Sequence, residues 1–77
     1  MIKAYVLVVA NPGATKNVYN ALQNVKGVTE SHEVMGPYDI VVEIEVENLA
    51  DVPTILSDHI RSISGVESTT SLVTFPD

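Results

Sequence analysis

Apolar side chains occupy almost every position between residue 2 and residue 10. They form two alternating sets: Ile2, Ala4, Val6 and Val8 on one side, and Tyr5, Leu7 and Val9 on the other. A segment that is apolar on both sides and rich in β-branched residues is typical of a central strand covered on both faces. The sequence Asn-Pro-Gly-Ala-Thr then interrupts the pattern, and Thr15 is a candidate N-cap for a helix.

The spacing of apolar residues then changes from every second position to every third or fourth. This spacing predicts one stripe of a helix, formed by Val18, Ala21, Leu22 and Val25. A weaker strand is expected over Val28 to Met35. A third strand is predicted by strict alternation, with Ile40, Val42, Ile44 and Val46 on one face and Val41, Glu43, Glu45 and Glu47 on the other.

The last third of the chain repeats the helical spacing before returning to a strand. The buried stripe of the second helix is expected at Val52, Ile55, Leu56, Ile60 and Ile63. Either Asn48 or Asp51 can cap this helix, and Pro53 lies in its first turn, where a missing N–H is harmless. A fourth strand is predicted over Val66 to Phe75.

Two segments of the chain resemble each other, Leu22 to Ser31 (LQNVKGVTES) and Ile60 to Thr69 (IRSISGVEST). Each predicts the end of a helix, a glycine in the left-handed conformation and then a strand. The element order is therefore β-α-β-β-α-β, the ferredoxin-like arrangement of the α+β class. Both helices then cover one face of a four-stranded antiparallel sheet. The other face lacks cover, so we expect two sheets to pack as in a dimeric α+β barrel.

Composition supports self-association of a single domain that comprises residues 1–77. A chain of this size buries only about 60% of the surface that its unfolded form exposes, so it needs further stabilisation. It has no cysteine, and its two histidines, His32 and His59, are too isolated to suggest a zinc site. With a hydrophobic fraction of 45%, oligomerisation is the remaining source of stability.

The net charge of −6 argues against direct nucleic-acid binding, since the four Lys and Arg residues form no basic patch. No signal peptide opens the chain, and no apolar run approaches the roughly 18 residues of a membrane span. A cytoplasmic protein is the expectation.

The strongest local signals are a turn and a strand of hydroxyl side chains. Gly36-Pro37-Tyr38-Asp39 is predicted to join the second and third strands, because Pro fixes φ and Gly permits a sharp turn. In the last strand, Thr69 and Ser71 share one face. These residues can be purely structural, with Asp39 accepting hydrogen bonds from turn amides. Alternatively, the amides and hydroxyls bind the carboxylate of a zwitterion and Asp39 binds its ammonium.

The segments VMGPYDIVVEIEVENLADVPTIL and IRSISGVESTTSLV resemble the RAM (regulation of amino acid metabolism) domain, which is the effector-binding domain of Lrp/AsnC transcriptional regulators. The shared motifs are Gly-x-Tyr/Phe-Asp before a strand and Gly-Val-x-x-Thr-x-Thr. The resemblance implies ligand-binding residues at Gly36, Tyr38, Asp39, Thr69 and Ser71. Ser71 replaces the usual second threonine, and Pro37 removes one amide from the turn.

The resemblance also implies partners. RAM domains dimerise sheet to sheet, and the dimers assemble into rings, often octamers, with free amino acids bound between dimers. Because the first strand begins at residue 2, no helix-turn-helix precedes it, and we expect a stand-alone RAM protein that associates with itself and with full-length Lrp/AsnC regulators. The resemblance implies neither a metal nor a cofactor, and no catalytic residue.

Three alternatives remain open. An ACT-like regulatory domain shares the fold, but its Asp-x-Pro-Gly-x-Leu motif is only faintly matched at NPGATKNVYNAL. A dimeric α+β barrel enzyme would require a residue such as His32 to project between sheet and helices, and no acid–base pair, activated nucleophile or phosphate loop is visible. A structural protein would co-assemble with a DNA-binding relative without binding any ligand.

Overall fold

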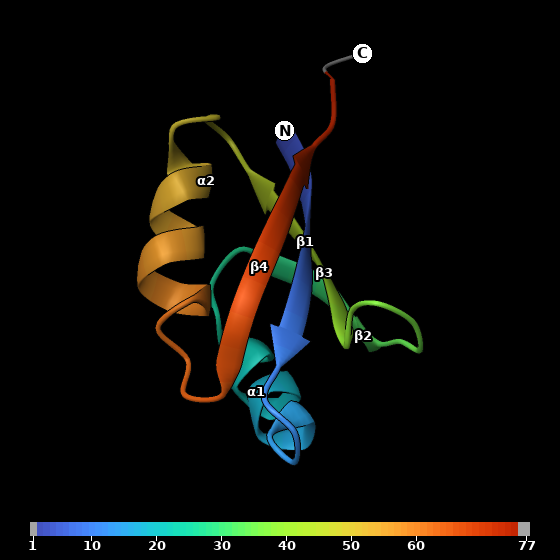
Figure 1. The fold of residues 1–77 in the computed structure, drawn as a ribbon. Helices are drawn as coiled ribbons and strands as arrows, with labels where there is room; N and C mark the ends of the chain where they lie inside the picture. Colours follow the sequence, from blue (N-terminus) through green and yellow to red (C-terminus); the bar gives the residue numbers. More distant parts are fainter. Residues whose placement is uncertain (1, 76–77) are drawn as a thin grey trace.

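A computed structural model describes residues 2–75. Its elements are β1 (Ile2–Ala10), α1 (Thr15–Leu22), β2 (Val28–Glu33), β3 (Ile40–Val46), α2 (Asp51–Thr54), continued by the π-helix Ile55–Ile60, and β4 (Val66–Val73). The strands form one sheet in the order β2-β3-β1-β4, and every neighbouring pair is antiparallel. This arrangement confirms the predicted ferredoxin-like α+β fold (Figure 1).

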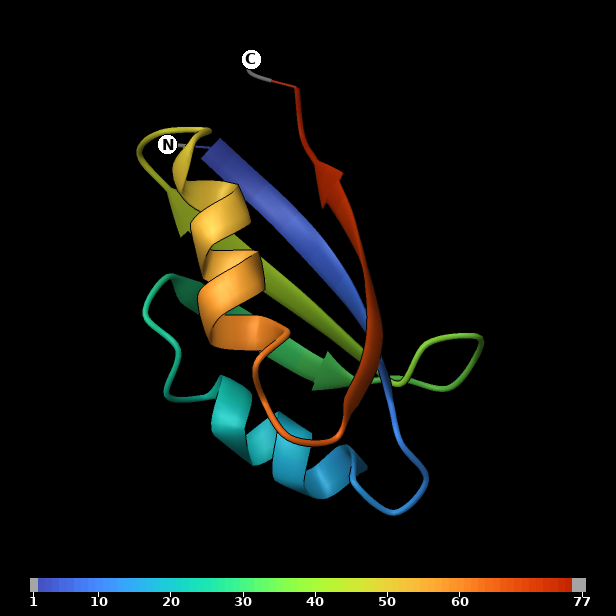
Figure 2. The same ribbon diagram turned by 60° about the vertical axis from the view of Figure 1, so that its left-hand side comes forward.

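Both helices lie on the same side of the sheet (Figure 2). The core between the helices and the sheet is entirely aliphatic. It contains Ala4, Val6, Val8, Ala10, Val18, Leu22, Ile40, Val42, Ile44, Val46, Val52 and Ile60. The alternation predicted for β3 is confirmed, because its four even-numbered apolar side chains are buried and its odd-numbered ones are half-buried. Burial of each such side chain stabilises the fold by roughly 1.5–3 kcal/mol.

The predicted ends of two strands are wrong. β2 ends at Glu33, not Met35, because Gly36 has φ of 150° and Pro37 offers no amide for continued pairing. β4 ends at Val73, not Phe75. Thr74 donates one further backbone hydrogen bond to Lys3 O at 3.0 Å, after which Phe75 is 94% exposed.

The predicted helix caps are also wrong. The residue that precedes α1 is Ala14, and Thr15 is already helical, with no side-chain cap hydrogen bond. α2 likewise has no side-chain cap; the carbonyl of Asn48 accepts a hydrogen bond from the amide of Asp51 at 3.0 Å. At α1 the carbonyl of Asn11 accepts a hydrogen bond from the amide of Ala14 at 2.9 Å, so a backbone carbonyl is the acceptor at both helix starts. Pro53 lies in the first turn, as predicted.

The internal repeat is confirmed by matching backbone geometry. After α1, Val25 donates to Leu22 O and Val28 donates to Val25 O, each at 3.2 Å. After the π-helix, Ile63 donates to Ile60 O at 3.1 Å and Val66 to Ile63 O at 3.2 Å. Gly27 and Gly65 both have φ of 100°, as a left-handed turn requires. Each glycine follows this turn and does not directly follow the last helical residue. Neither glycine therefore occupies the predicted C′ position.

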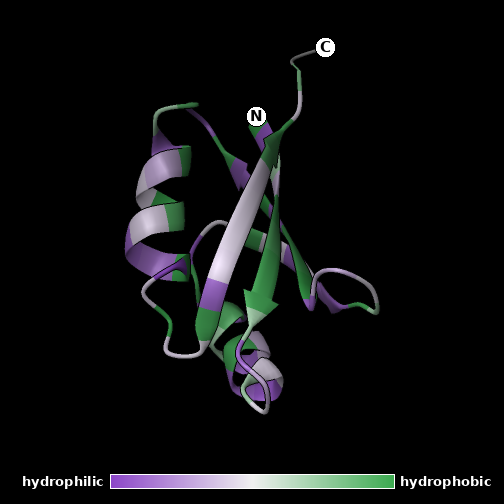
Figure 3. Ribbon diagram, viewed as in Figure 1, coloured by the Kyte–Doolittle hydropathy of each residue, from purple (hydrophilic) through white to green (hydrophobic). Residues whose placement is uncertain are grey.

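The face of the sheet opposite the helices has no cover from residues 2–75. It carries Tyr5, Leu7 and Val9 from β1, Val41 from β3 and Leu72 from β4, all partly exposed. Leu72 is 54% exposed and lies directly opposite Tyr5. Much of β1 is hydrophobic in Figure 3, whereas the middle of β4 is near neutral. Among the described residues, no helix is long and apolar enough to cross a lipid bilayer.

Candidate functional site

The predicted turn forms the loop between β2 and β3, and this loop extends away from the sheet in Figures 1 and 2. The amide of Val34 closes it with a hydrogen bond to Asp39 O at 2.9 Å. Met35 at its tip is fully exposed, and Gly36 has no atom within 4 Å of where a Cβ would lie. Tyr38 and Asp39 are half-buried at the base of the loop. The exposed backbone around Gly36 is therefore accessible to another molecule.

Asp39 extends the pairing of β1 with β3 by one step. The last paired residues are Val8 and Ile40. The amide of Asp39 donates to Val8 O at 2.9 Å, and its Oδ2 accepts a hydrogen bond from the amide of Ala10 at 2.8 Å. The side chain thus takes the place of a backbone carbonyl that the turn removes from the ladder. The structural role anticipated for Asp39 is present, although its partner is a strand amide and not a turn amide. Within residues 2–75, no hydrogen bond is made to Oδ1.

Thr69 and Ser71 lie on the helix-facing side of β4, opposite Val8 and Val6 respectively. Both are half-buried. The Oγ of Ser71 is inaccessible to solvent and has no hydrogen-bond partner among the described residues. A buried hydroxyl without a partner typically costs about 1–3 kcal/mol, so this atom is a candidate donor for a further group.

One chain does not bring the two groups of predicted residues into contact. Ile40, Val8 and Thr69 form one row across β3, β1 and β4. Because adjacent strands are about 4.8 Å apart, the base of the turn and Thr69 are separated by about 10 Å. The turn residues and the β4 hydroxyls therefore lie on two separate parts of the chain's surface.

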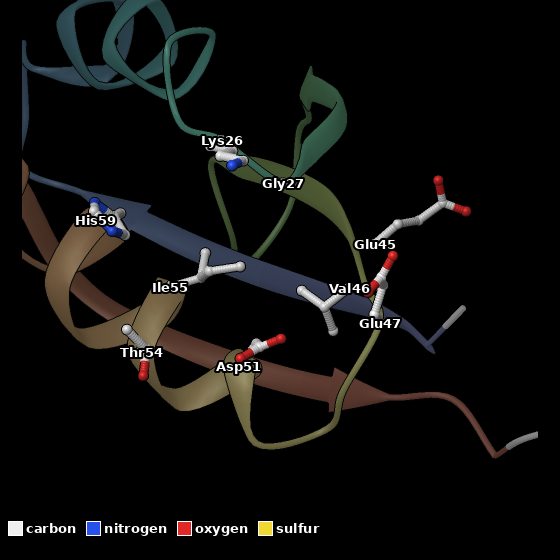
Figure 4. A pocket seen from close by; sticks show the side chains of 9 residues that line it. All are labelled: Lys26, Gly27, Glu45, Val46, Glu47, Asp51, Thr54, Ile55 and His59. Atoms are coloured by element: carbon white, nitrogen blue, oxygen red, sulfur yellow. The ribbon is translucent and has the colours of Figure 1, made fainter.

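A separate hollow of about 520 Å³, which the sequence reasoning missed, lies between the start of β2, the end of β3 and the second helix (Figure 4). Its polar lining includes Lys26, Glu45, Glu47, Asp51 and His59. These residues lie in three separate parts of the chain, so no local sequence motif indicates that they are close in space. No group of three or more His, Cys, Asp or Glu within the described residues is placed to hold a metal ion.

His32 does not project between sheet and helices, as the enzyme alternative required. It pairs with Val41 and is exposed on the open face of the sheet, where its Nε2 lies 3.5 Å from Glu30 Oε1. Its neighbours Ser31 and Glu33 face the helices instead, and they bind Gln23 and Lys16 of the α1 region. The helix-facing side of β2 therefore carries structural hydrogen bonds.

A small α+β module whose helices cover one face of the sheet is compatible with several classes of ligand-binding domain, and comparison with known proteins distinguishes between them. Residues 3–76 match the model of the Lrp/AsnC ligand binding domain. The chain belongs to this family.

A curated relative, an uncharacterized HTH-type transcriptional regulator of Pyrococcus furiosus, is 35% identical over 75 residues, covering 94% of this chain and 50% of the relative. The chain thus spans about half the length of the transcriptional regulators it matches. A homocitrate synthase of Sulfolobus acidocaldarius is 37% identical over 60 residues, which cover 77% of this chain but only 13% of the enzyme.

Among solved structures, a Thermus thermophilus protein superposes with a TM-score of 0.95 at 28% identity, covering 100% of this chain and 96% of that one. A feast or famine regulatory protein of M. tuberculosis, complexed with L-methionine, has a TM-score of 0.83 at 19% identity, with 100% and 52% covered. The second likeness establishes a shared fold only.

Proposed function

We propose that this chain is a non-enzymatic, amino-acid-binding RAM domain that acts in the cytoplasm and regulates amino acid metabolism. The observation that carries the proposal is the family match over nearly the whole chain. The complex of the M. tuberculosis relative with L-methionine supports an amino acid as the class of ligand.

In this proposal the ligand binds between dimers at the turn and at β4. Asp39 Oδ1 accepts a hydrogen bond from the ligand's ammonium while Oδ2 remains on the amide of Ala10. Amides around Gly36 and Tyr38 bind the carboxylate, and the Thr69 and Ser71 hydroxyls orient the ligand. The separation of about 10 Å between turn and β4 is consistent with a site completed by a neighbouring chain.

Self-association follows from the open face of the sheet. Partly exposed Tyr5, Leu7 and Leu72 would be buried if two sheets packed face to face, and this burial would favour a dimer. Dimers would assemble further into an octamer or similar ring. Ligand bound between dimers would shift this assembly in proportion to its differential affinity for the two states.

Isothermal titration calorimetry of the full chain against all twenty amino acids tests the proposal. We expect heat with at least one of them. Asp39→Asn should abolish that heat, because it removes the charge yet retains an oxygen for the amide of Ala10. Ser64→Ala, exposed in the connection before β4, is the control and should bind normally. Absence of heat with every amino acid would rule out ligand sensing.

The second candidate is a structural partner of DNA-binding relatives, and the apolar side chains of Tyr5, Leu7 and Leu72 on the open sheet face favour it. A sheet-to-sheet interface formed by one RAM domain should accept another, so this function needs no ligand. Native mass spectrometry after co-expression with a full-length Lrp/AsnC regulator distinguishes mixed assemblies from separate ones. Detection of homo-oligomers alone would exclude this candidate.

A further inference from the structure

The hollow of about 520 Å³ beside the second helix lies within a single chain, well apart from the turn and the β4 hydroxyls. Three parts of the chain form it: the connection from α1 to β2, the end of β3, and the row Asp51, Ile55 and His59 of the second helix. The neighbouring row of Val52, Leu56 and Ile60 faces the core. The helix therefore presents one row to the protein interior and the next to the hollow.

The floor of the hollow is fixed by Gly27. A Cβ built on Gly27 would lie 3.0 Å from Ile55 Cδ1, so the backbone and this side chain are already in close contact. Gly27 O also accepts a hydrogen bond from the amide of Glu45 at 2.9 Å. The corresponding Gly65 of the second repeat faces Ala14 and Val18 instead, where a Cβ would lie 2.8 Å from Ala14 Cβ.

The ionisable side chains around the hollow are free to bind another molecule. None of the ion pairs or side-chain hydrogen bonds within residues 2–75 involves Lys26, Glu47, Asp51 or His59. Figure 4 shows His59 toward one end of the hollow and Glu47 toward the other, with Lys26 and Asp51 on opposite sides between them. Groups of opposite charge on two sides of the hollow suit a ligand that carries both charges.

The net charge of the hollow defines the ligand further. Two carboxylates, Glu47 and Asp51, accompany one lysine around the hollow, so the lining favours a ligand of net positive charge. A π-helical segment, a feature frequent at functional sites, forms one wall, with the amide of Arg61 donating to Leu56 O at 2.8 Å.

We propose that this hollow binds a free amino acid with a cationic side chain. The ligand's carboxylate is held by Lys26 and His59, and its side-chain ammonium by Asp51 and Glu47. The site is complete within one chain, so binding does not depend on the oligomeric state or on the turn site.

Titration of the ¹⁵N-labelled full chain with L-lysine, followed by ¹H–¹⁵N NMR, tests this site. We expect shifts at the amides of Gly27, Glu47 and Ile55, and at least tenfold weaker binding of L-norleucine, which has the same chain length without the terminal amine. Asp51→Asn should weaken L-lysine binding about tenfold. Asp58→Asn, on the same helix but outside the hollow, should not.

Each outcome separates this site from the proposed function. Shifts confined to Gly36, Tyr38 and Asp39 would overturn the hollow as a site while supporting the turn. Shifts at the hollow alone would support it independently of the turn. Unperturbed hollow amides, equal binding of L-norleucine, or equal weakening by both aspartate variants would overturn the inference.

Discussion

The side chain of Asp39 and the amide of Ala10 form a hydrogen bond of 2.8 Å that continues the β1–β3 ladder beyond its last backbone pair. The two residues are 29 positions apart in the chain, so this bond fixes the base of the β2–β3 loop to the end of the central strand. Ala10 is also next to the register shift between β1 and β4. Asp39 therefore stabilises a junction where three strands meet.

Asp39→Ala should destabilise the fold by about 2 kcal/mol, because the amide of Ala10 loses a charged acceptor in a partly buried position. Asp39→Asn should cost roughly half as much, since its amide oxygen can still accept this hydrogen bond. Urea denaturation at fixed protein concentration measures both values. Equal destabilisation by the two variants would contradict the ladder role.

The hydrophobic periodicity alone predicted the fold, because the fold is determined by which side chains are removed from water. The alternation from Ile40 to Val46 and the stripe through Val18 and Leu22 placed the core correctly. Strand and helix ends were less predictable, since they depend on single backbone hydrogen bonds such as that from Thr74 to Lys3 O. A side-chain pattern does not record these bonds.

The candidate site was predictable only in part. The turn at residues 36–39 was recognisable from Gly and Pro, which constrain φ locally, and the shared face of Thr69 and Ser71 followed from strand alternation. The attachment of Asp39 to Ala10 and the hollow beside His59 were not predictable. Both depend on segments that are distant in the sequence and meet only after folding.

Ser71→Ala should stabilise the free protein by about 1 kcal/mol, because it removes a buried hydroxyl that has no hydrogen-bond partner among the described residues. The same change should weaken amino acid binding if this hydroxyl contacts the ligand. Thermal denaturation with and without ligand measures both effects. Ser64→Ala is the control, since Ser64 is exposed in the connection before β4 and its substitution should change neither. Destabilisation of the free protein by Ser71→Ala would show that the hydroxyl already has a partner.

Leu72→Glu should dissociate the proposed dimer, since it places a charge opposite Tyr5 at the β4 edge of the open face. Leu49→Glu is a matched control, because Leu49 is similarly exposed, 57% against 54%, but lies in the connection after β3 and not on the sheet. Sedimentation velocity over a dilution series should show a lower molecular mass only for Leu72→Glu. A dimer that survives this change would place the interface elsewhere.

Stability should also respond to alkaline pH through Lys16, whose Nζ lies 2.6 Å from Glu33 Oε2. The hydrogen bond with Glu33 and then its negative charge raise the pKa of Lys16 above its usual 10.5. A pKa that is raised on folding gives stability below pH 10.5, and this contribution is lost as pH rises through the folded-state pKa. Lys16→Met should remove this part of the pH dependence in denaturation experiments above pH 10. Because the pair is exposed, added salt should reduce the effect.

Gly65→Ala should destabilise the protein by about 2–4 kcal/mol for two combined reasons. Its φ of 100° is unfavourable for a residue with a Cβ, and that atom would lie 2.8 Å from Ala14 Cβ and 3.1 Å from Val18 Cγ2. Gly13→Ala separates the two effects, because Gly13 has φ of 82° but no atom within 4 Å of the new methyl group. This control should cost only about 1–2 kcal/mol. Equal losses of unfolding free energy in the two variants, measured by chemical denaturation, would mean that the α1–β4 junction relaxes around the added methyl group. Backbone strain alone would then account for the requirement for glycine.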